Sequence, residues 1–165
     1  SANIGEGVSN GIAIGQGSSN STSNSIVLGN GSITKVSTSG AIVTTADINA
    51  KHLKGNSGAL SIAASTGAGT SPSGLTVTGT DMSGIVSLTT GSSPSVNSVL
   101  ATITYNTAYA TAPIVVITPA NAATASLTAG QAVWVDISTT GFTINTNATA
   151  VVSSTAYKWN YVVIQ

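Results

Sequence analysis

The aromatic residues of this chain are confined to its second part, and this constrains the fold more than any other feature. The chain has 165 residues, and its two Trp, four Tyr and one Phe all follow position 104. They are Tyr105, Tyr109, Trp134, Phe142, Tyr157, Trp159 and Tyr161. Aromatic side chains supply much of the buried area of a compact core. The two parts of the chain must therefore build their interiors differently, which predicts two unlike modules.

Charge is scarce along the whole chain. Charged residues make up 5% of the sequence and the formal net charge is zero, whereas an ordinary soluble domain has roughly 25% charged residues. Abundant Val, Ile and Thr favour strands. There is no charged field to attract nucleic acid, and no apolar run reaches the length of about 18 residues needed for a membrane span. We expect an all-β protein that binds no nucleic acid and does not insert into a membrane.

Residues 1–34 contain a short internal repeat. Each copy is a short apolar segment followed by Gly-x-Gly, and the copies are Ile4–Gly7, Ile12–Ser18 and Ile26–Ser32. The aligned positions Ile4, Ile14 and Leu28 are separated by 10 and then 14 residues. Glycine admits positive φ, so each Gly-x-Gly predicts a tight corner after a strand. Strands this short cannot bury a face alone, so we expect stacked coils whose core is completed by neighbouring chains.

The segment Asn24–Ser32 resembles the head repeat of trimeric autotransporter adhesins, and Gly11–Gly15 matches it as well. Similar repeats occur in bacteriophage tail fibres and tailspikes. The resemblance implies a left-handed parallel β-roll with a period near fourteen residues, in which three chains pack around one axis. The chain has no cysteine, so subunit association is also a candidate source of its stability.

Residues 35–73 are expected to form a polar connector. A helix is predicted over Asp47–Lys54, where Asp47 caps the N-terminus and Gly55 ends the helix. Strand and turn is the alternative for this segment. The stretch Gly67–Gly74, which is rich in Gly, Ser, Ala and Thr, is interpreted as a linker or long loop.

Residues 74–165 contain eight short apolar runs with turn residues between them. The runs are Leu75–Thr78, Ile85–Thr89, Val99–Tyr105, Ile114–Thr118, Ala132–Ile137, Phe142–Asn145, Ala150–Ser153 and Tyr157–Ile164. Eight strands at this spacing predict an antiparallel, jelly-roll-like β-sandwich head. The last run has apolar residues on both faces, so we expect it to be a central strand or to pack against a neighbouring subunit.

Several segments of this head resemble the C-terminal β-sandwich domains of phage and viral fibre proteins. They are Thr78–Gly84, Thr89–Gly91, Ala112–Pro119, Thr140–Ile144 and the aromatic strand Tyr157–Tyr161. The resemblance covers most of residues 74–165 and implies a head that binds a receptor.

Few residues are suited to catalysis. Enzymes need a positioned acid, base, nucleophile or metal, and His52 is the one histidine of the chain. We interpret His52 as a solvated or interface residue. The alternative is a stack of three copies on a trimer axis that holds a metal or an anion. We predict a protein that is not an enzyme, with no catalytic residue, cofactor-binding residue or metal ligand.

The four carboxylates Glu6, Asp47, Asp81 and Asp136 are far apart in the sequence. A glycosidase needs two carboxyl groups within roughly 5–10 Å, and a sandwich could bring Asp81 and Asp136 together. The preferred interpretation of Asp81 is a turn residue that accepts backbone N–H bonds. A calcium site at Asp81 is the alternative, although the dense oxygen-ligand run of an EF-hand loop is absent.

Two aromatic residues are candidates for receptor binding. Trp134 is predicted to face opposite the apolar row of Val133, Val135 and Ile137, and Tyr109 falls in a predicted loop. Exposed aromatic side chains form binding hot spots. The alternative for Trp134 is packing in a second layer or at a subunit interface.

The sequence therefore predicts a homotrimeric fibre fragment of a bacteriophage or virus, located at the tail or fibre tip of the virion. A β-roll shaft (1–34) leads through the connector (35–73) to the head (74–165), which attaches to a host cell-surface glycan or protein. The alternatives are the passenger of a bacterial trimeric adhesin, located at the bacterial surface, and a polysaccharide-degrading tailspike fragment.

Overall fold

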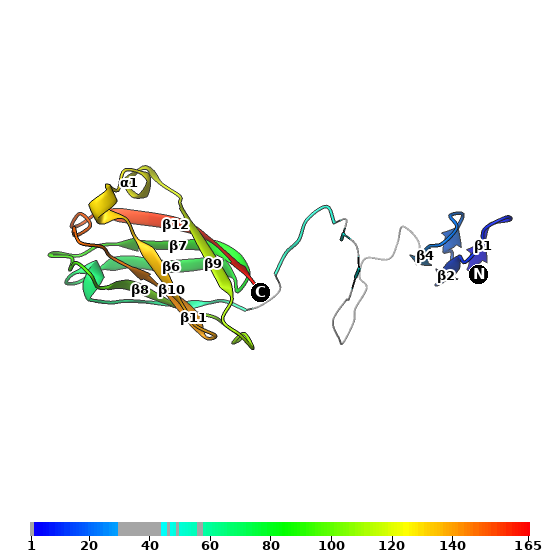
Figure 1. The fold of residues 1–165 in the computed structure, drawn as a ribbon, viewed down its shortest axis with the longest axis horizontal. Coiled ribbons are helices and arrows are strands. Elements are labelled where there is room, and N and C mark those ends of the chain that lie inside the picture. Colours follow the sequence, from blue (N-terminus) through cyan, green and yellow to red (C-terminus); the bar gives the residue numbers. More distant parts are fainter. Residues whose placement is uncertain (1, 30–43, 46, 49, 56–57) are drawn as a thin grey trace. The chain divides into compact units, whose positions relative to one another are not determined.

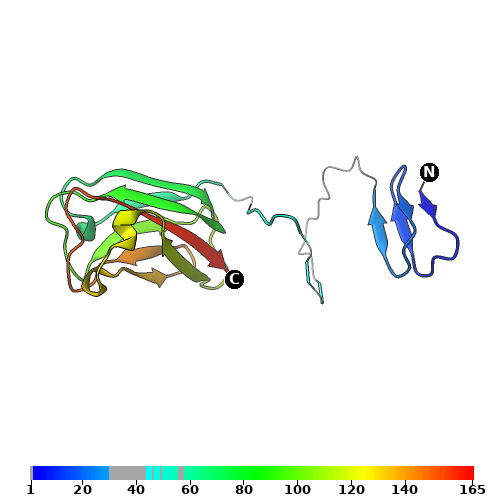
Figure 2. The ribbon, with the colours of Figure 1, turned by 90° about the horizontal axis from the view of Figure 1, so that it is seen from above.

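The computed structural model describes residues 2–29, 44–45, 47–48, 50–55 and 58–165. The chain divides into two compact units, Ser1–Ala50 and Lys51–Gln165. In its described residues the first unit is a small coil of parallel strands, and the second is a β-sandwich (Figures 1 and 2). The all-β prediction is confirmed. Within the described residues, no helix is long and apolar enough to cross a membrane.

The coil contains four strands of two or three residues. They are β1 (Asn3–Ile4), β2 (Ile12–Ile14), β3 (Ser19–Asn20) and β4 (Ile26–Leu28). Strands β2 and β4 pair in parallel, with Ile12 opposite Ile26 and Ile14 opposite Leu28. This register confirms the fourteen-residue return. The Gly-x-Gly corner after β4 extends to Asn30 and Gly31, which lie outside the described residues.

The alignment of Ile4 with Ile14 is wrong. Strand β1 pairs in parallel with β3, which places Ile4 opposite Asn20 rather than beside Ile14. Each turn of the coil has two sides, so β1 and β3 form one side while β2 and β4 form the other. The ten-residue spacing between Ile4 and Ile14 therefore relates two different sides of the coil.

The corners of the coil repeat with the same period as its strands. Asn10 and Asn24 both have φ of 55°, a left-handed conformation that asparagine tolerates better than most residues. Their side chains are joined by a hydrogen bond of 3.0 Å from Nδ2 of Asn10 to Oδ1 of Asn24. Gly15 and Gly29 follow β2 and β4 and have φ of 112° and 82°. This backbone conformation is accessible chiefly to glycine and turns the chain out of the strand.

Asn20 holds the interior of the coil together. It is 0% exposed. Its Nδ2 donates to the carbonyl oxygens of Ile12 (3.1 Å) and Ser25 (2.8 Å), and its Oδ1 accepts from the backbone N–H of Thr22 (3.0 Å) and from the hydroxyl of Ser25 (2.9 Å). One amide side chain thus satisfies polar groups from successive turns that would otherwise be buried without partners.

The helix predicted over Asp47–Lys54 is wrong. The described residues of this segment, 47–48 and 50–54, contain no helix. Ile48 and Leu53 are 65% and 75% exposed. A helix of about two turns is marginal in water unless an apolar face packs against something, and these two aliphatic side chains are mostly exposed.

The sandwich consists of two antiparallel four-stranded sheets. One has the order β10 (Trp134–Ile137), β11 (Gly141–Asn145), β8 (Val99–Thr104) and β5 (Ser61–Ala64). The other has the order β6 (Ser73–Thr80), β7 (Ser83–Thr89), β12 (Ala156–Ile164) and β9 (Ile114–Pro119). Two hairpins, β6–β7 and β10–β11, each stay within one sheet, and the other connections cross between the sheets. The predicted antiparallel sandwich is confirmed.

Seven of the eight predicted strands are present, and β12 is central as expected. The strand predicted over Ala150–Ser153 is absent. The backbone N–H of Val152 donates instead to the hydroxyl of Tyr157 at 2.9 Å, so this segment closes a turn rather than joining a sheet.

The sandwich begins earlier in the sequence than predicted. Ser61–Ala64 lies within the predicted connector (35–73), but it forms β5 and pairs with β8. Of the two alternatives for Gly67–Gly74, the linker is wrong, because η1 (Thr66–Ala68) packs into the sandwich, Ala68 is 0% exposed, and β6 begins at Ser73; residues 69–72 form a loop between them. Small residues gave this segment the composition of a linker, although the same small residues let it pack closely.

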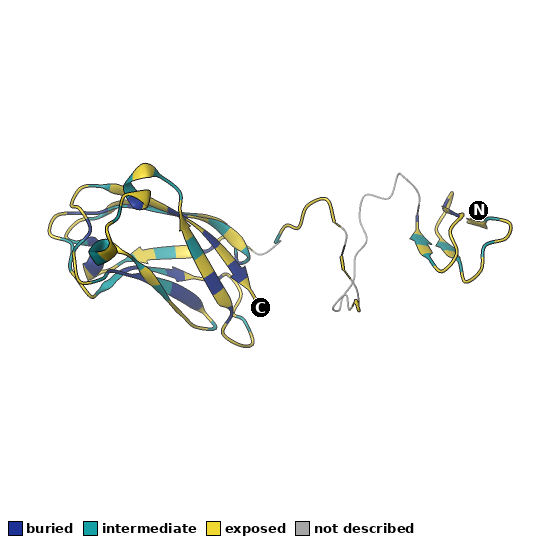
Figure 3. Ribbon diagram, turned by 45° about the horizontal axis from the view of Figure 1, so that its top comes forward, coloured by how far each residue is buried: buried dark blue, intermediate teal, exposed yellow. Residues whose placement is uncertain are grey.

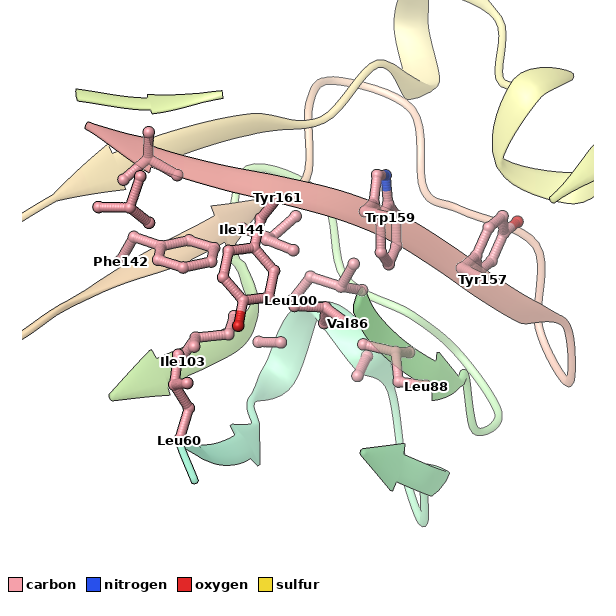
Figure 4. Packing of buried hydrophobic residues seen from close by; sticks show 14 of the residues in the cluster. Leu60, Val86, Leu88, Leu100, Ile103, Phe142, Ile144, Tyr157, Trp159 and Tyr161 are labelled. Atoms are coloured by element: carbon pink, nitrogen blue, oxygen red, sulfur yellow. The ribbon is translucent and has the colours of Figure 1, made fainter. Parts of the chain in front are cut away.

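Strand β12 carries the centre of the core. Its burial alternates strictly, with Tyr157, Trp159, Tyr161 and Val163 buried and the residues between them exposed (Figures 3 and 4). The rings of Tyr157 and Trp159 stack at 5.8 Å. The inward side chains of the neighbouring and facing strands surround this row, and they are Val86, Leu88, Leu100, Ile103, Phe142 and Ile144.

A four-residue helix, α1 (Ala122–Ala125), lies in the connection from β9 to β10. It is not among the elements predicted from the sequence. Asn121 caps it by accepting from the backbone N–H of Thr124 at 3.0 Å. The hydroxyl of Thr124 in turn accepts from the backbone N–H of Lys158 at 2.9 Å. A second short turn, η2 (Ala129–Gln131), follows with a capping box formed by Thr128 and Gln131. These local hydrogen bonds fix the long crossing from β9 to β10.

We predict that Asn20→Asp opens the coil. The substitution replaces the Nδ2 donor with an oxygen that faces two carbonyl oxygens, and a buried polar group left without its partner costs about 1–3 kcal/mol. Hydrogen exchange of the Ile12 and Gly29 amides should accelerate by at least about tenfold. Asn10→Gly is the matched control, since it removes an exposed amide but keeps the left-handed conformation. Unchanged exchange in Asn20→Asp would contradict this role.

Candidate functional site

The outer face of the β10-β11-β8-β5 sheet carries a row of polar side chains. The register places Asp136 opposite Thr143, and Thr143 opposite Thr102. Because side chains alternate along a strand, all three point away from the core, into which Ile144 and Ile103 project. The row crosses three neighbouring strands and combines one carboxylate with two hydroxyl groups.

A hollow of about 210 Å³ lies on this face. We call it the Asp136 hollow. Its polar lining residues are Thr102, Thr104, Asp136, Ser138, Thr140 and Thr143. Asp136 is exposed, and its carboxylate makes no hydrogen bond to another described residue. The carboxylate is thus available to accept hydrogen bonds from a molecule in solution.

Trp134 lies beside this row on the same face of β10. It is 52% exposed, and it is opposite Asn145 in the register. The side chain of Asn145 donates from Nδ2 to the hydroxyl of Thr143 at 3.0 Å. As predicted, Trp134 faces away from Val133 and Val135, which pack against the core. Ile137 departs from that prediction, because it is 42% exposed at the end of the strand.

Tyr109 lies in a loop, as predicted, but it is held by the fold rather than projecting freely. Its ring makes an edge-to-face contact with Tyr105, with centroids 5.0 Å apart. Its hydroxyl donates to the backbone carbonyl oxygen of Asp81 at 3.1 Å. Tyr109 also lines a second hollow, of about 380 Å³, together with Asp81, Met82 and Gln165. The ring is therefore only partly accessible.

Asp81 is buried, with 6% of its surface exposed. It accepts backbone N–H bonds as predicted, but from a distant loop: Oδ1 from Asn106 at 2.7 Å and Oδ2 from Thr107 at 3.0 Å. Both oxygens are used to fix the loop after β8 to the β6–β7 hairpin. The described residues contain no group of three or more His, Cys, Asp or Glu side chains that could hold a metal ion.

Asp81 and Asp136 do not form a pair. Asp136 lines the hollow on the outer face of one sheet, and Asp81 lines the other hollow, with both of its oxygens bonded to backbone. The two-carboxylate arrangement of a glycosidase is therefore not formed by these residues. His52 is exposed, in agreement with a solvated side chain.

The segment Gly7-Val8-Ser9-Asn10-Gly11 has the spacing of a hydrolase nucleophile elbow. Such an elbow needs a strand–turn–helix context that lifts the serine out of the fold. Here the segment joins β1 to β2. The backbone N–H of Ser9 donates to the hydroxyl of Ser23 at 3.1 Å. The spacing is thus part of the coil repeat.

Three tyrosines cluster near Asp81. Burial, with the nearby Asp81 carboxylate and neighbouring tyrosines as smaller causes, raises the pKa of Tyr105 and of Tyr161 from 10.0 to about 12. The pKa of Tyr109 is also raised, first by burial and then by Asp81. The hydroxyl of Tyr161 donates to the carbonyl oxygen of Thr80 at 2.8 Å, whereas the buried hydroxyl of Tyr105 finds no partner among the described residues.

The fold and this surface define a two-module all-β protein with an exposed aromatic and carboxylate face on its sandwich. Comparison with protein-family models, curated proteins and solved structures gives no significant match to this chain.

We predict opposite effects of removing two tyrosine hydroxyls. Tyr161→Phe should lower the free energy of unfolding by about 0.5–1.5 kcal/mol, because it removes a satisfied hydrogen bond. Tyr105→Phe should leave it unchanged or raise it by about 1 kcal/mol, because it removes a buried hydroxyl that lacks a partner. Urea unfolding of the two matched variants measures both effects. A larger loss in Tyr105→Phe than in Tyr161→Phe would contradict the assignment.

Stability should also fall in alkaline solution. The folded protein raises the pKa of Tyr105 and Tyr161 to about 12, so it favours the protonated phenol. This contribution is fully present below about pH 10 and is lost as the pH rises to about 12. Unfolding curves across this range should show the decline, and the Tyr105→Phe/Tyr161→Phe double variant should show a shallower one. Equal slopes for both proteins would count against the cause.

Proposed function

We propose that this chain is part of a homotrimeric fibre protein of a bacteriophage or virus that attaches the virion to a host-cell surface. The observation that carries the proposal is the exposed aliphatic face of the coil. Ile12 and Ile14 on β2 lie opposite Ile26 and Leu28 on β4, and the four side chains are 47–62% exposed. Such a cluster of exposed large aliphatic residues is typical of an interaction surface.

The coil buries little of its own apolar surface. Its inward positions between these side chains are Ala13 and Val27, and both are only partly buried. Burying a Leu or Ile side chain fully contributes about 1.5–3 kcal/mol, so covering this face would add substantially to stability. Three copies around one axis would cover the same face in each chain, and a cyclic arrangement leaves no copy unpaired.

The sandwich offers a second surface of the same kind. On the outer face of the β6-β7-β12-β9 sheet, Val162 is paired with Val116 and Ile164 with Ile114. These four side chains are 44–65% exposed. The prediction that the last strand packs against a neighbouring subunit is compatible with this cluster. Contacts at both units would support a trimer whose three heads are held together.

A trimer would present three copies of the Trp134 face. Linked weak sites gain affinity through effective concentration, which suits attachment to a surface that carries many copies of one receptor. Because Asp81 and Asp136 do not form a carboxylate pair, the degradation of a polysaccharide receives no support from these residues. Attachment without cleavage is therefore the function that we propose.

The oligomeric state tests the proposal. Sedimentation of the full chain should give the mass of a trimer, and the Ile14→Ser/Leu28→Ser double variant should dissociate at the same concentration. Ile48→Ser/Leu53→Ser is the matched control, since it replaces two exposed aliphatic residues (65% and 75%) outside the four strands of the coil and should remain trimeric. Labelled trimer should bind intact bacterial cells of a susceptible strain, and the dissociated variant should bind much less. A stable folded monomer for the unmodified chain would overturn the proposal.

A further inference from the structure

We propose that the Asp136 hollow, together with Trp134, is a binding site for a neutral hexose. The inference rests on the proposed attachment function, and it names the chemical class of the receptor that this face recognises. It depends on the juxtaposition of an exposed indole ring, an unengaged carboxylate and a row of threonine hydroxyls on one face of one sheet.

The aromatic part of the site is the ring of Trp134. A face of an indole ring is electron-rich, and the C–H groups on one side of a hexose ring carry the opposite polarity. Trp134 is half exposed on the face that carries the row of Asp136, Thr143 and Thr102, so a sugar can reach it from solution. Since alternate residues on a strand are about 7 Å apart, a sugar stacked on Trp134 would lie within reach of the Asp136 carboxylate.

The polar part of the site suits vicinal hydroxyl groups. An ionised carboxylate only accepts hydrogen bonds, and its two oxygens can accept from hydroxyls on adjacent carbon atoms. Thr102 and Thr143 lie next in the row, and a hydroxyl group both donates and accepts. A hexose needs such a mixture, because each of its own hydroxyls is both a donor and an acceptor.

The size of the hollow also favours a single sugar ring. Its volume of about 210 Å³ is smaller than the range of about 300–1,000 Å³ typical of sites for drug-sized ligands. A peptide or protein receptor would need a larger surface. The hollow therefore fits one residue of a glycan, with neighbouring residues extending into solvent.

The charge of the hollow selects among sugars. No lysine lines it, and Lys158 belongs to β12, in the other sheet of the sandwich. Asp136 is thus the one charged residue in the lining. A sugar carboxylate brought to about 4 Å from Asp136 would be repelled enough to weaken binding roughly fivefold in water. The site should therefore prefer a neutral hexose to the corresponding uronic acid.

The test uses the full chain and matched pairs of methyl glycosides, namely glucose with glucuronic acid and galactose with galacturonic acid. Iodide quenching of tryptophan fluorescence provides the signal, because Trp134 is half exposed while Trp159 is 1% exposed. At least one neutral sugar should protect Trp134 from iodide, and its acidic counterpart should bind roughly fivefold more weakly. Absence of protection by every sugar, or equal binding of the acidic partner, would overturn the proposal.

Substitutions separate the roles of the residues, with binding measured by calorimetry. Trp134→Ala should weaken binding by at least about tenfold, and Trp134→Phe should restore part of it because a ring face is kept. Asp136→Asn should remove the preference for the neutral sugar over its acid. Lys158→Ala, on the other sheet, should change neither property. Unaltered binding in Trp134→Ala, or an unaltered preference in Asp136→Asn, would contradict the site.

Failure of this inference is distinguishable from failure of the proposed function. If the trimer binds cells and Trp134→Ala binds them equally well, the hexose site is wrong while attachment stands. If the unmodified chain is a monomer that nevertheless binds the neutral sugar with the expected preference, the fibre proposal is wrong and the hexose site stands.

Discussion

The inward row of β12 is the interaction on which the rest of the structure depends. Tyr157, Trp159, Tyr161 and Val163 lie on one face of a central strand and contact the inner side chains of both sheets. Large aromatic side chains dominate the buried area of a core, and the chain has few aromatic residues besides the three in this row. Because β12 lies between β7 and β9 in its sheet, its outward face forms part of the aliphatic surface of the sandwich, and its inward face packs against the sheet that carries Trp134 and Asp136.

The two units have small interiors that are stabilised by different interactions. The sandwich buries aromatic rings, whereas the coil has no aromatic residue and uses the single buried amide of Asn20 with a ladder of asparagines and glycines. A polar interior of this kind specifies the register of the coil but buries little apolar surface. The exposed isoleucines and Leu28 are the consequence, and they are the observation on which the proposed association rests.

Polar side chains in the sandwich are divided between structure and recognition. The sequence makes Asp81 a candidate site, but both of its carboxylate oxygens accept hydrogen bonds from backbone N–H groups of a distant loop. Tyr109 is likewise held in place, by the edge-to-face contact with Tyr105 and by the hydrogen bond from its hydroxyl to the backbone of Asp81. Asp136 and Trp134 make no comparable contacts to the described residues and are exposed on the surface. Each group contains one aspartate and one aromatic residue, so residue type does not separate them as clearly as the contacts of each side chain do.

The sequence by itself determined the strand content, the outward direction of Trp134 on β10, and the fourteen-residue return of Ile14 to Leu28, because these follow from periodicities that local sterics impose. It did not determine that Ser61–Ala64 joins a sheet, that Ile4 lies opposite Asn20, or that Ala150–Ser153 is a turn, because those depend on which distant backbone groups are free to pair. The Asp136 hollow belongs to the same category. Thr102, Asp136 and Thr143 are neighbours only in the sheet, so tertiary structure alone decided that they form one surface beside Trp134.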